Sequence, residues 1–154
     1  MRFKVMLSLA LLTTSASAGE TSTYGQRIVA AVLMGEAWGE GEVGMTAVAE
    51  VIHNRAKQTG RSPLAVVLKK GEFSSLRHTT PEALYQKFCR KREFQTALRL
   101  AKTCYNTPEA LPNLTRGASY YDGRENRPPW LSEMRLVACV GNQNFYVPKH
   151  AFDN

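Results

Sequence analysis

The stretch Gly35-Glu36-Ala37-Trp38-Gly39-Glu40 joins two segments that both have the periodicity of buried helices, and it therefore decides how the chain folds. Before it, apolar residues recur every three or four positions, which predicts a first helix over 24–38 ended by the glycines that follow. After it, residues 43–57 carry a second apolar stripe. This segment is predicted to be the central core helix, and Gly60 ends it.

Glu36 is the candidate acid catalyst of this stretch. It lies one helical turn beyond Val32, on the side of the helix that carries Ile28 and Val29. A carboxyl group that is partly desolvated by apolar neighbours has a raised pKa, so it can deliver a proton near neutral pH. We therefore expect Glu36 to face inward among hydrophobic side chains. The alternative is that it only ends the helix and reaches water.

The rest of the chain predicts further helices followed by a small sheet. Ser62-Pro63 begins a short helix over 64–70, and Thr80-Pro81 begins a longer helical region that reaches Tyr105. After a proline-rich connection, the remaining apolar runs predict short strands at 118–121, 135–140 and 145–147. The predicted fold class is α+β, mostly helical, with a small late antiparallel sheet.

The first residues have the pattern of a secretory signal peptide over 1–18. Two basic residues come first, an apolar run follows over 5–12, and Ala16-Ser17-Ala18 forms a small-residue cleavage site. The alternatives are an uncleaved anchor or a buried helix, but the run is too short for a stable membrane span. We expect residues 19–154 to form a single catalytic domain that is exported to the periplasm or outside the cell.

The charge of the chain indicates the kind of partner it meets. The formal net charge is +7 at pH 7, which favours an anionic partner. For an exported protein, cell-wall polymers or membrane surfaces are more plausible partners than nucleic acid. We expect no nucleic-acid partner and a monomeric protein.

The cysteines leave the disulfide pairing open. The chain has three, Cys89, Cys104 and Cys139, which allow one bridge and a leftover thiol. No Cys-x-x-Cys pair occurs and the histidines stand apart from the cysteines, so the spacing does not resemble a zinc site. We expect neither a metal nor an organic cofactor.

Several short motifs occur in order between about Arg27 and Val147. After Gly35–Glu40 they are Gly44, Ala47-Val48-Ala49, Asn54-Arg55, Glu72-Phe73-Ser74, Gly117-Ala118-Ser119-Tyr120-Tyr121, Pro129-Trp130 and Val140-Gly141-Asn142-Gln143-Asn144-Phe145-Tyr146. In this order they resemble the SleB-type cell wall hydrolases, a family that includes the spore-cortex-lytic enzymes. Two positions depart from the family pattern: Trp38 stands where arginine is usual, and Gln143 stands where histidine is expected.

The resemblance implies a lysozyme-like fold and cleavage of the glycan strand of peptidoglycan between N-acetylmuramic acid and N-acetylglucosamine. It also implies that Glu36 is the catalytic acid of a lytic transglycosylase, which closes an anhydro ring on the muramic sugar instead of adding water. One carboxyl group can then serve as acid and base, without the second carboxylate of most glycosidases. The alternatives are a true muramidase with Glu40 as second carboxylate, and a peptidoglycan-binding module that has lost catalysis.

Other residues of these motifs are candidates for binding the sugar chain. They are Trp38, Asn54, Ser74, Tyr120, Tyr121, Trp130, Gln143 and Tyr146. Flat aromatic faces pack well on pyranose rings, although each ring could equally belong to the core. For Asn54 we favour an internal hydrogen bond, because the adjoining helix face is apolar. Glu40 is expected mainly to supply negative charge at the start of the second helix.

Overall fold

The computed structural model describes residues 22–152 of the chain. The expected signal peptide at 1–18 lies outside these residues. Among the described residues, no helix is both long and apolar enough to cross a membrane. The prediction of a mostly helical α+β fold with a small late antiparallel sheet is confirmed.

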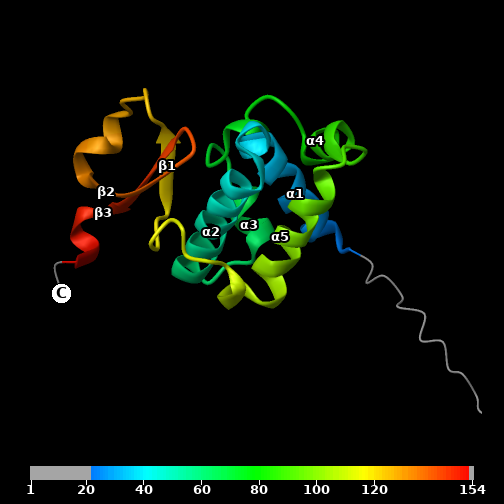
Figure 1. The fold of residues 1–154 in the computed structure, drawn as a ribbon, viewed down its shortest axis with the longest axis horizontal. Coiled ribbons are helices and arrows are strands. Elements are labelled where there is room, and N and C mark those ends of the chain that lie inside the picture. Colours follow the sequence, from blue (N-terminus) through cyan, green and yellow to red (C-terminus); the bar gives the residue numbers. More distant parts are fainter. Residues whose placement is uncertain (1–21, 153–154) are drawn as a thin grey trace, which may run out of the picture.

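The helical part surrounds one buried helix. Its elements are α1 (Tyr24–Ala37), α2 (Gly41–Thr59), α3 (Pro63–Val67), α4 (Pro81–Phe88) and α5 (Phe94–Asn106). Each of the other helices packs against α1, and all side chains from Ile28 to Met34 are at most 2% exposed. A helix that is apolar all round is buried on every side. The prediction that residues 43–57 form the central helix is therefore wrong, since α1 has that place (Figure 1).

The helical region predicted from Thr80 to Tyr105 is two helices rather than one. The chain turns between α4 and α5, where the Lys91 amide donates to the Phe88 carbonyl at 2.9 Å and the Phe94 amide donates to the Lys91 carbonyl at 3.1 Å. These are single-turn bonds that do not continue a helix. The break allows α4 and α5 to pack on α1 in different directions (Figure 1).

The late strands form one antiparallel sheet of β1 (Tyr120–Gly123), β2 (Met134–Val140) and β3 (Gln143–Pro148), in the order β1-β3-β2. The sheet lies beside α2 (Figure 1). Phe145 of β3 is fully buried and forms a second, smaller apolar cluster with Ala47 and Val51 of α2. This cluster joins the sheet to the helical part.

Polar side chains of α2 bind the segment that leads into β1. Glu50 is only 3% exposed, and its carboxylate accepts hydrogen bonds from the Leu114 and Thr115 amides and from the Thr115 hydroxyl, each at 2.8 Å. One turn later, the Asn54 amide group donates to the Ala118 carbonyl at 2.8 Å and Arg55 Nε donates to the Ser119 carbonyl at 2.7 Å. The start of β1 therefore has a defined position relative to the helices.

The cysteines do not form the disulfide that the sequence left open. All three are free thiols in the structure. Cys104 is buried in α5, where burial raises the pKa of its thiol to about 12. Cys139 is exposed on strand β2 of the sheet, whereas Cys104 lies in the helical part.

We predict that Glu50→Ala destabilises the protein by about 3 kcal/mol, because the buried amide of Thr115 and the partly buried amide of Leu114 lose their acceptor. Urea unfolding followed by circular dichroism measures the change. The matched control is Glu109→Ala, an exposed carboxylate of the same connection, which should change stability by less than about 0.5 kcal/mol. Equal stabilities of the two variants would contradict the role given to Glu50.

Candidate active site

Glu36 lies in the last turn of α1, at a hollow between the helical part and the sheet. The hollow has a volume of about 470 Å³. It is lined by Glu36, Arg55, Lys70, Gly71, Glu72, Ser74, Arg77, Tyr120, Tyr121, Asp122, Gly123, Trp130 and Gln143. The sequence predicted site roles for Glu36, Ser74, Tyr120, Tyr121, Trp130 and Gln143, and the fold brings all of these together.

Hydrogen-bond donors surround the Glu36 carboxylate. Oε1 accepts from the Ser75 amide at 2.7 Å, and Oε2 accepts from the Tyr121 hydroxyl at 2.7 Å. The Ser74 hydroxyl lies 3.2 and 3.1 Å from the two oxygens. The expectation that Glu36 lies among hydrophobic side chains is therefore wrong. The apolar stripe of α1 ends before it, and the carboxylate meets the polar turn η2 (Ser74–Leu76) and strand β1.

Tyr121 is a permanent donor to Glu36. Burial raises the pKa of the Tyr121 hydroxyl well above its usual value, and the negative charge of Glu36 raises it further. The Tyr121 ring stacks on Phe145 with 5.7 Å between ring centroids. The hydroxyl thus stays protonated wherever a carboxylate titrates, and the packing of its ring aims it at Glu36.

Gly35 allows the turn that carries Ser75 to approach α1. A Cβ atom at position 35 would lie 2.5 Å from Ser75 Cβ and 3.0 Å from Ser75 Oγ. Any other residue here would push the turn away and lengthen the bond from the Ser75 amide to Glu36. The close approach of Ser75 thus explains why position 35 is a glycine, which the sequence did not reveal.

Two aromatic rings form one wall of the hollow. Tyr120 and Trp130 both line it, and their ring centroids are 5.8 Å apart. Trp130 comes from the turn η4 (Pro129–Glu133). Tyr146, which the sequence placed with the sugar-binding candidates, is buried and packs edge-on against Trp130 at 5.6 Å. It contacts the Trp130 ring but does not itself line the hollow.

Gln143 contacts the backbone of Glu36 rather than its carboxylate. Its Nε2 donates to the Glu36 carbonyl oxygen at 3.5 Å. Its Oε1 is buried and has no hydrogen-bond partner among the described residues. Gln143 therefore joins β3 to the end of α1 and leaves one polar atom unsatisfied beside the hollow.

Trp38, Glu40 and Asn54 lie outside the hollow. Trp38 is 43% exposed, packs edge-on against Phe88, and has the Lys91 ammonium 4.3 Å from its ring centroid. Asn54 makes the internal bond to Ala118 described above, as the sequence favoured.

Glu40 joins the helices to the turn between β2 and β3. Its Oε2 accepts from the Asn142 amide at 3.0 Å. The neighbouring Gly141 has a φ of 53°, and a Cβ there would collide with the Glu40 carboxylate. The helix is already broken at Ala37, so Glu40 does not follow Glu36 on one helix face.

The sequence missed several charged residues of the hollow. Arg55 Nη1 lies 3.0 Å from Glu72 Oε2, and the guanidinium lies over the rings of Phe73 and Tyr120. Asp122 follows the two tyrosines on β1 and accepts from the Gly123 amide at 2.8 Å and from the Asn126 side chain. The Asn54-Arg55 motif was a signal for Arg55, whereas nothing local in the sequence distinguished Asp122.

Comparisons with known proteins bear on the family and the fold of the chain. A family model described as cell wall hydrolase matches residues 39–146. Among solved structures, the catalytic domain of the germination-specific lytic transglycosylase SleB from Bacillus anthracis matches with a TM-score of 0.60 and 21% identity, over 84% of this chain and 98% of that one. At this identity the match shows the fold, which is lysozyme-like. A comparison with curated proteins gives no match.

We predict that Gly35→Ala displaces the η2 turn and removes protection of the Ser75 amide from hydrogen exchange, because the new Cβ collides with Ser75. Overpacking of this kind also costs about 1–3 kcal/mol of stability. The matched control is Gly39→Ala, since a Cβ at position 39 meets nothing within 4 Å. NMR measures the exchange rate of the Ser75 amide in both variants. Unchanged protection of this amide in Gly35→Ala would contradict the prediction.

Proposed function

The chain belongs to the cell wall hydrolase family, and on this premise we propose that it cleaves the glycan strand of peptidoglycan between N-acetylmuramic acid and N-acetylglucosamine with Glu36 as the catalytic residue. The observation that carries the proposal is the Glu36 carboxylate, oriented by Ser74, Ser75 and Tyr121 in a hollow that two aromatic rings border. The residues matched by the family model begin after Glu36. Its role therefore rests on this geometry and on the resemblance of the Gly35–Glu40 stretch.

The walls of the hollow suit a sugar chain. Tyr120 and Trp130 offer ring faces on which pyranose rings pack, and their hydroxyl and indole groups can bond sugar hydroxyls. Arg55, Lys70 and Arg77 add hydrogen-bond donors around the same space. This mixture of flat apolar faces and polar groups supports a carbohydrate ligand.

Glu36 acts first as an acid and then as a base in the proposed reaction. Its carboxyl proton passes to the glycosidic oxygen as the bond from that oxygen to C1 of the muramic sugar breaks. The resulting carboxylate takes the proton from the sugar's own hydroxyl as that oxygen bonds to C1 and closes the anhydro ring. Glu36 ends the cycle protonated, and no water is consumed.

The donors around Glu36 support a role in which its carboxylate must be accurately placed. Three groups from two different elements fix both of its oxygens, so little reorganisation is needed when it takes up a proton from the substrate. Transglycosylation requires only one oriented carboxyl group. We favour this reaction over hydrolysis because the resemblance to the SleB-type enzymes implies it.

The muramidase alternative needs a second carboxylate in the hollow. Glu40 does not line the hollow, whereas Asp122 does. A hydrolytic reaction would therefore use Asp122 to position a water molecule rather than Glu40. The binding-module alternative predicts attachment to sacculi without release of any fragment.

We also propose that the protein acts outside the cytoplasm, since peptidoglycan lies there. The basic excess of the chain favours the anionic polymers of the wall. Residues 1–18 would act as the signal peptide for export. The domain over 19–154 would act as a monomer without a cofactor.

We predict that Glu36→Gln lowers the rate of fragment release from purified sacculi by at least about 100-fold, because the amide can neither donate nor take up the proton. The matched control is Glu40→Gln, four residues away and outside the hollow, which should keep most of the activity. Circular dichroism checks that both variants fold. Retained turnover in Glu36→Gln would end the assignment, and a wild-type protein that binds sacculi without releasing fragments would favour the binding module.

We predict that mass spectrometry of the wild-type digest finds anhydromuropeptides, because the muramic hydroxyl closes the ring. Reducing muramic ends would contradict transglycosylation and support hydrolysis. In that case Asp122→Asn should lower the rate by at least about tenfold, since its carboxylate is then needed to position water. Under transglycosylation the same substitution should leave the anhydro product unchanged.

A further inference from the structure

A second hollow opens directly beside the one that contains Glu36. Its volume is about 420 Å³. It shares Arg55, Glu72 and Tyr120 with the Glu36 hollow, so these three residues form the boundary between the two spaces. Its remaining lining residues come from the end of α2, the region of α3 and the start of β1: Gln58, Thr59, Arg61, Val66, Lys69 and Ser119. The family resemblance and the proposed reaction leave this space without a function.

Positive charge exceeds negative charge in the second hollow. Arg55, Arg61 and Lys69 line it, against the single carboxylate of Glu72. Glu72 is already used, since Oε2 lies 3.0 Å from Arg55 Nη1 and Oε1 lies 2.6 Å from Lys69 Nζ. Arg55 and Lys69 are thus both paired with Glu72, which offsets part of their positive charge.

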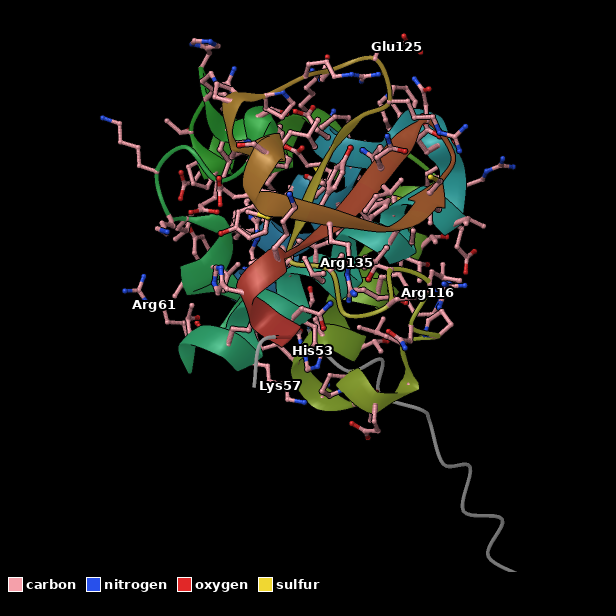
Figure 2. All side chains as sticks on the ribbon, turned by 90° about the vertical axis from the view of Figure 1, so that its left-hand side faces the viewer. His53, Lys57, Arg61, Arg116, Glu125 and Arg135 are labelled. Carbon is pink, nitrogen blue, oxygen red and sulfur yellow. The ribbon has the colours of Figure 1, made fainter. Side chains whose placement is uncertain are left out.

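Arg61 is the cation that is available to a ligand. It is exposed and forms no salt bridge with another described residue. Figure 2 shows its side chain extending away from the ribbon just after the end of α2. A guanidinium in this position presents paired donors that match the geometry of a carboxylate.

The aromatic walls distinguish the two spaces. Trp130 lines the Glu36 hollow but not the second one, where Tyr120 is the aromatic residue that both share. The second hollow has the aliphatic side chain of Val66 instead. The cations of the Glu36 hollow are balanced by as many carboxylates, whereas those of the second hollow exceed its one carboxylate. An acidic peptide has both a carboxylate and apolar side chains to place in such a space.

Ser119 provides a further polar group in the same wall. It is only 2% exposed, and its hydroxyl has no hydrogen-bond partner among the residues that the structure describes. A buried hydroxyl without a partner costs free energy that a bound polar ligand would recover. This second observation, independent of the charge, also indicates a polar ligand in the hollow.

We propose that the second hollow binds the acidic peptide stem of the muramic sugar, with Arg61 contacting a stem carboxylate. The inference rests on the proposed function, since it takes the muramic sugar to lie at Glu36. The stem branches from that sugar, so its binding site must lie next to the sugar at Glu36. The shared boundary of Arg55, Glu72 and Tyr120 meets this requirement. Strands that carry stems are then better substrates than bare strands.

The first test compares cleavage of two glycan preparations of equal length, one with intact stems and one from which an amidase has removed them. The wild-type protein should have a kcat/KM about threefold to tenfold higher on stem-bearing strands, as expected for one partly exposed charge-assisted contact. In Arg61→Gln this ratio should fall toward one. The matched control is Lys57→Gln, a cation near the same end of α2 that does not line the hollow, which should keep the wild-type ratio (Figure 2).

Equal loss of the ratio in Lys57→Gln and Arg61→Gln would overturn the proposal, because it would show a general effect of positive charge. A wild-type ratio of one would also overturn it. If Arg61→Gln lowers the rate on both strands equally, the hollow binds the next sugar of the strand and the stem assignment is wrong.

The second test does not depend on turnover. The Glu36→Gln variant is titrated with the tripeptide L-Ala-γ-D-Glu-meso-diaminopimelate while NMR follows the Ser119 and Tyr120 amides. Shifts that saturate, that weaken with added salt, and that disappear when the peptide carboxylates are amidated support the stem site. No shift would overturn it. Because the titration measures binding alone, it decides the stem site even if the protein proves to cleave no glycan.

Discussion

The hydrogen bonds from α2 to the chain that leads into β1 are the constraint on which the rest of the structure depends. Glu50, Asn54 and Arg55 lie at helical spacing, and their side chains bind backbone groups between Leu114 and Ser119. A buried carboxylate is tolerated here because three donors satisfy it. These bonds, together with the apolar contacts of Phe145, place the sheet beside α2. Bonds from Gln143 to the Glu36 carbonyl and from the Asn142 amide to Glu40 join the other end of the sheet to the helices.

The environment of Glu36 follows from that placement. Its donors come from β1 and from the η2 turn, and neither is near Glu36 in the sequence. The carboxylate is therefore oriented by polar contacts rather than desolvated by apolar ones. Gly35 allows the Ser75 amide, and the stacking of the Tyr121 ring places the Tyr121 hydroxyl, 2.7 Å from an oxygen of the Glu36 carboxylate. The Glu36 hollow and the neighbouring second hollow both form where the start of β1 meets the helical part.

Much of the fold could be predicted from local patterns, but less of the site could. Periodicity located α1, α2 and the late sheet, because each buries one face or more. The same periodicity did not reveal the break between α4 and α5, which depends on how both helices pack on α1. The glycine after Trp38 predicted that the helix ends before Glu40 and that Glu40 is mainly structural, but its bond to the Asn142 amide of the sheet could not be predicted from the sequence.

The sequence by itself determined the order of helices and strands, the family resemblance, and the choice of Glu36 as the candidate acid. These depend on neighbouring residues and short motifs. Only the tertiary structure decided that Asp122 and Arg55 face the hollow, that Trp38 and Tyr146 do not line it, and that donors surround the carboxylate. The physical reason is that each of these positions is set by contacts between segments far apart in the chain. Local propensity carries no information about which side chains such contacts bring together.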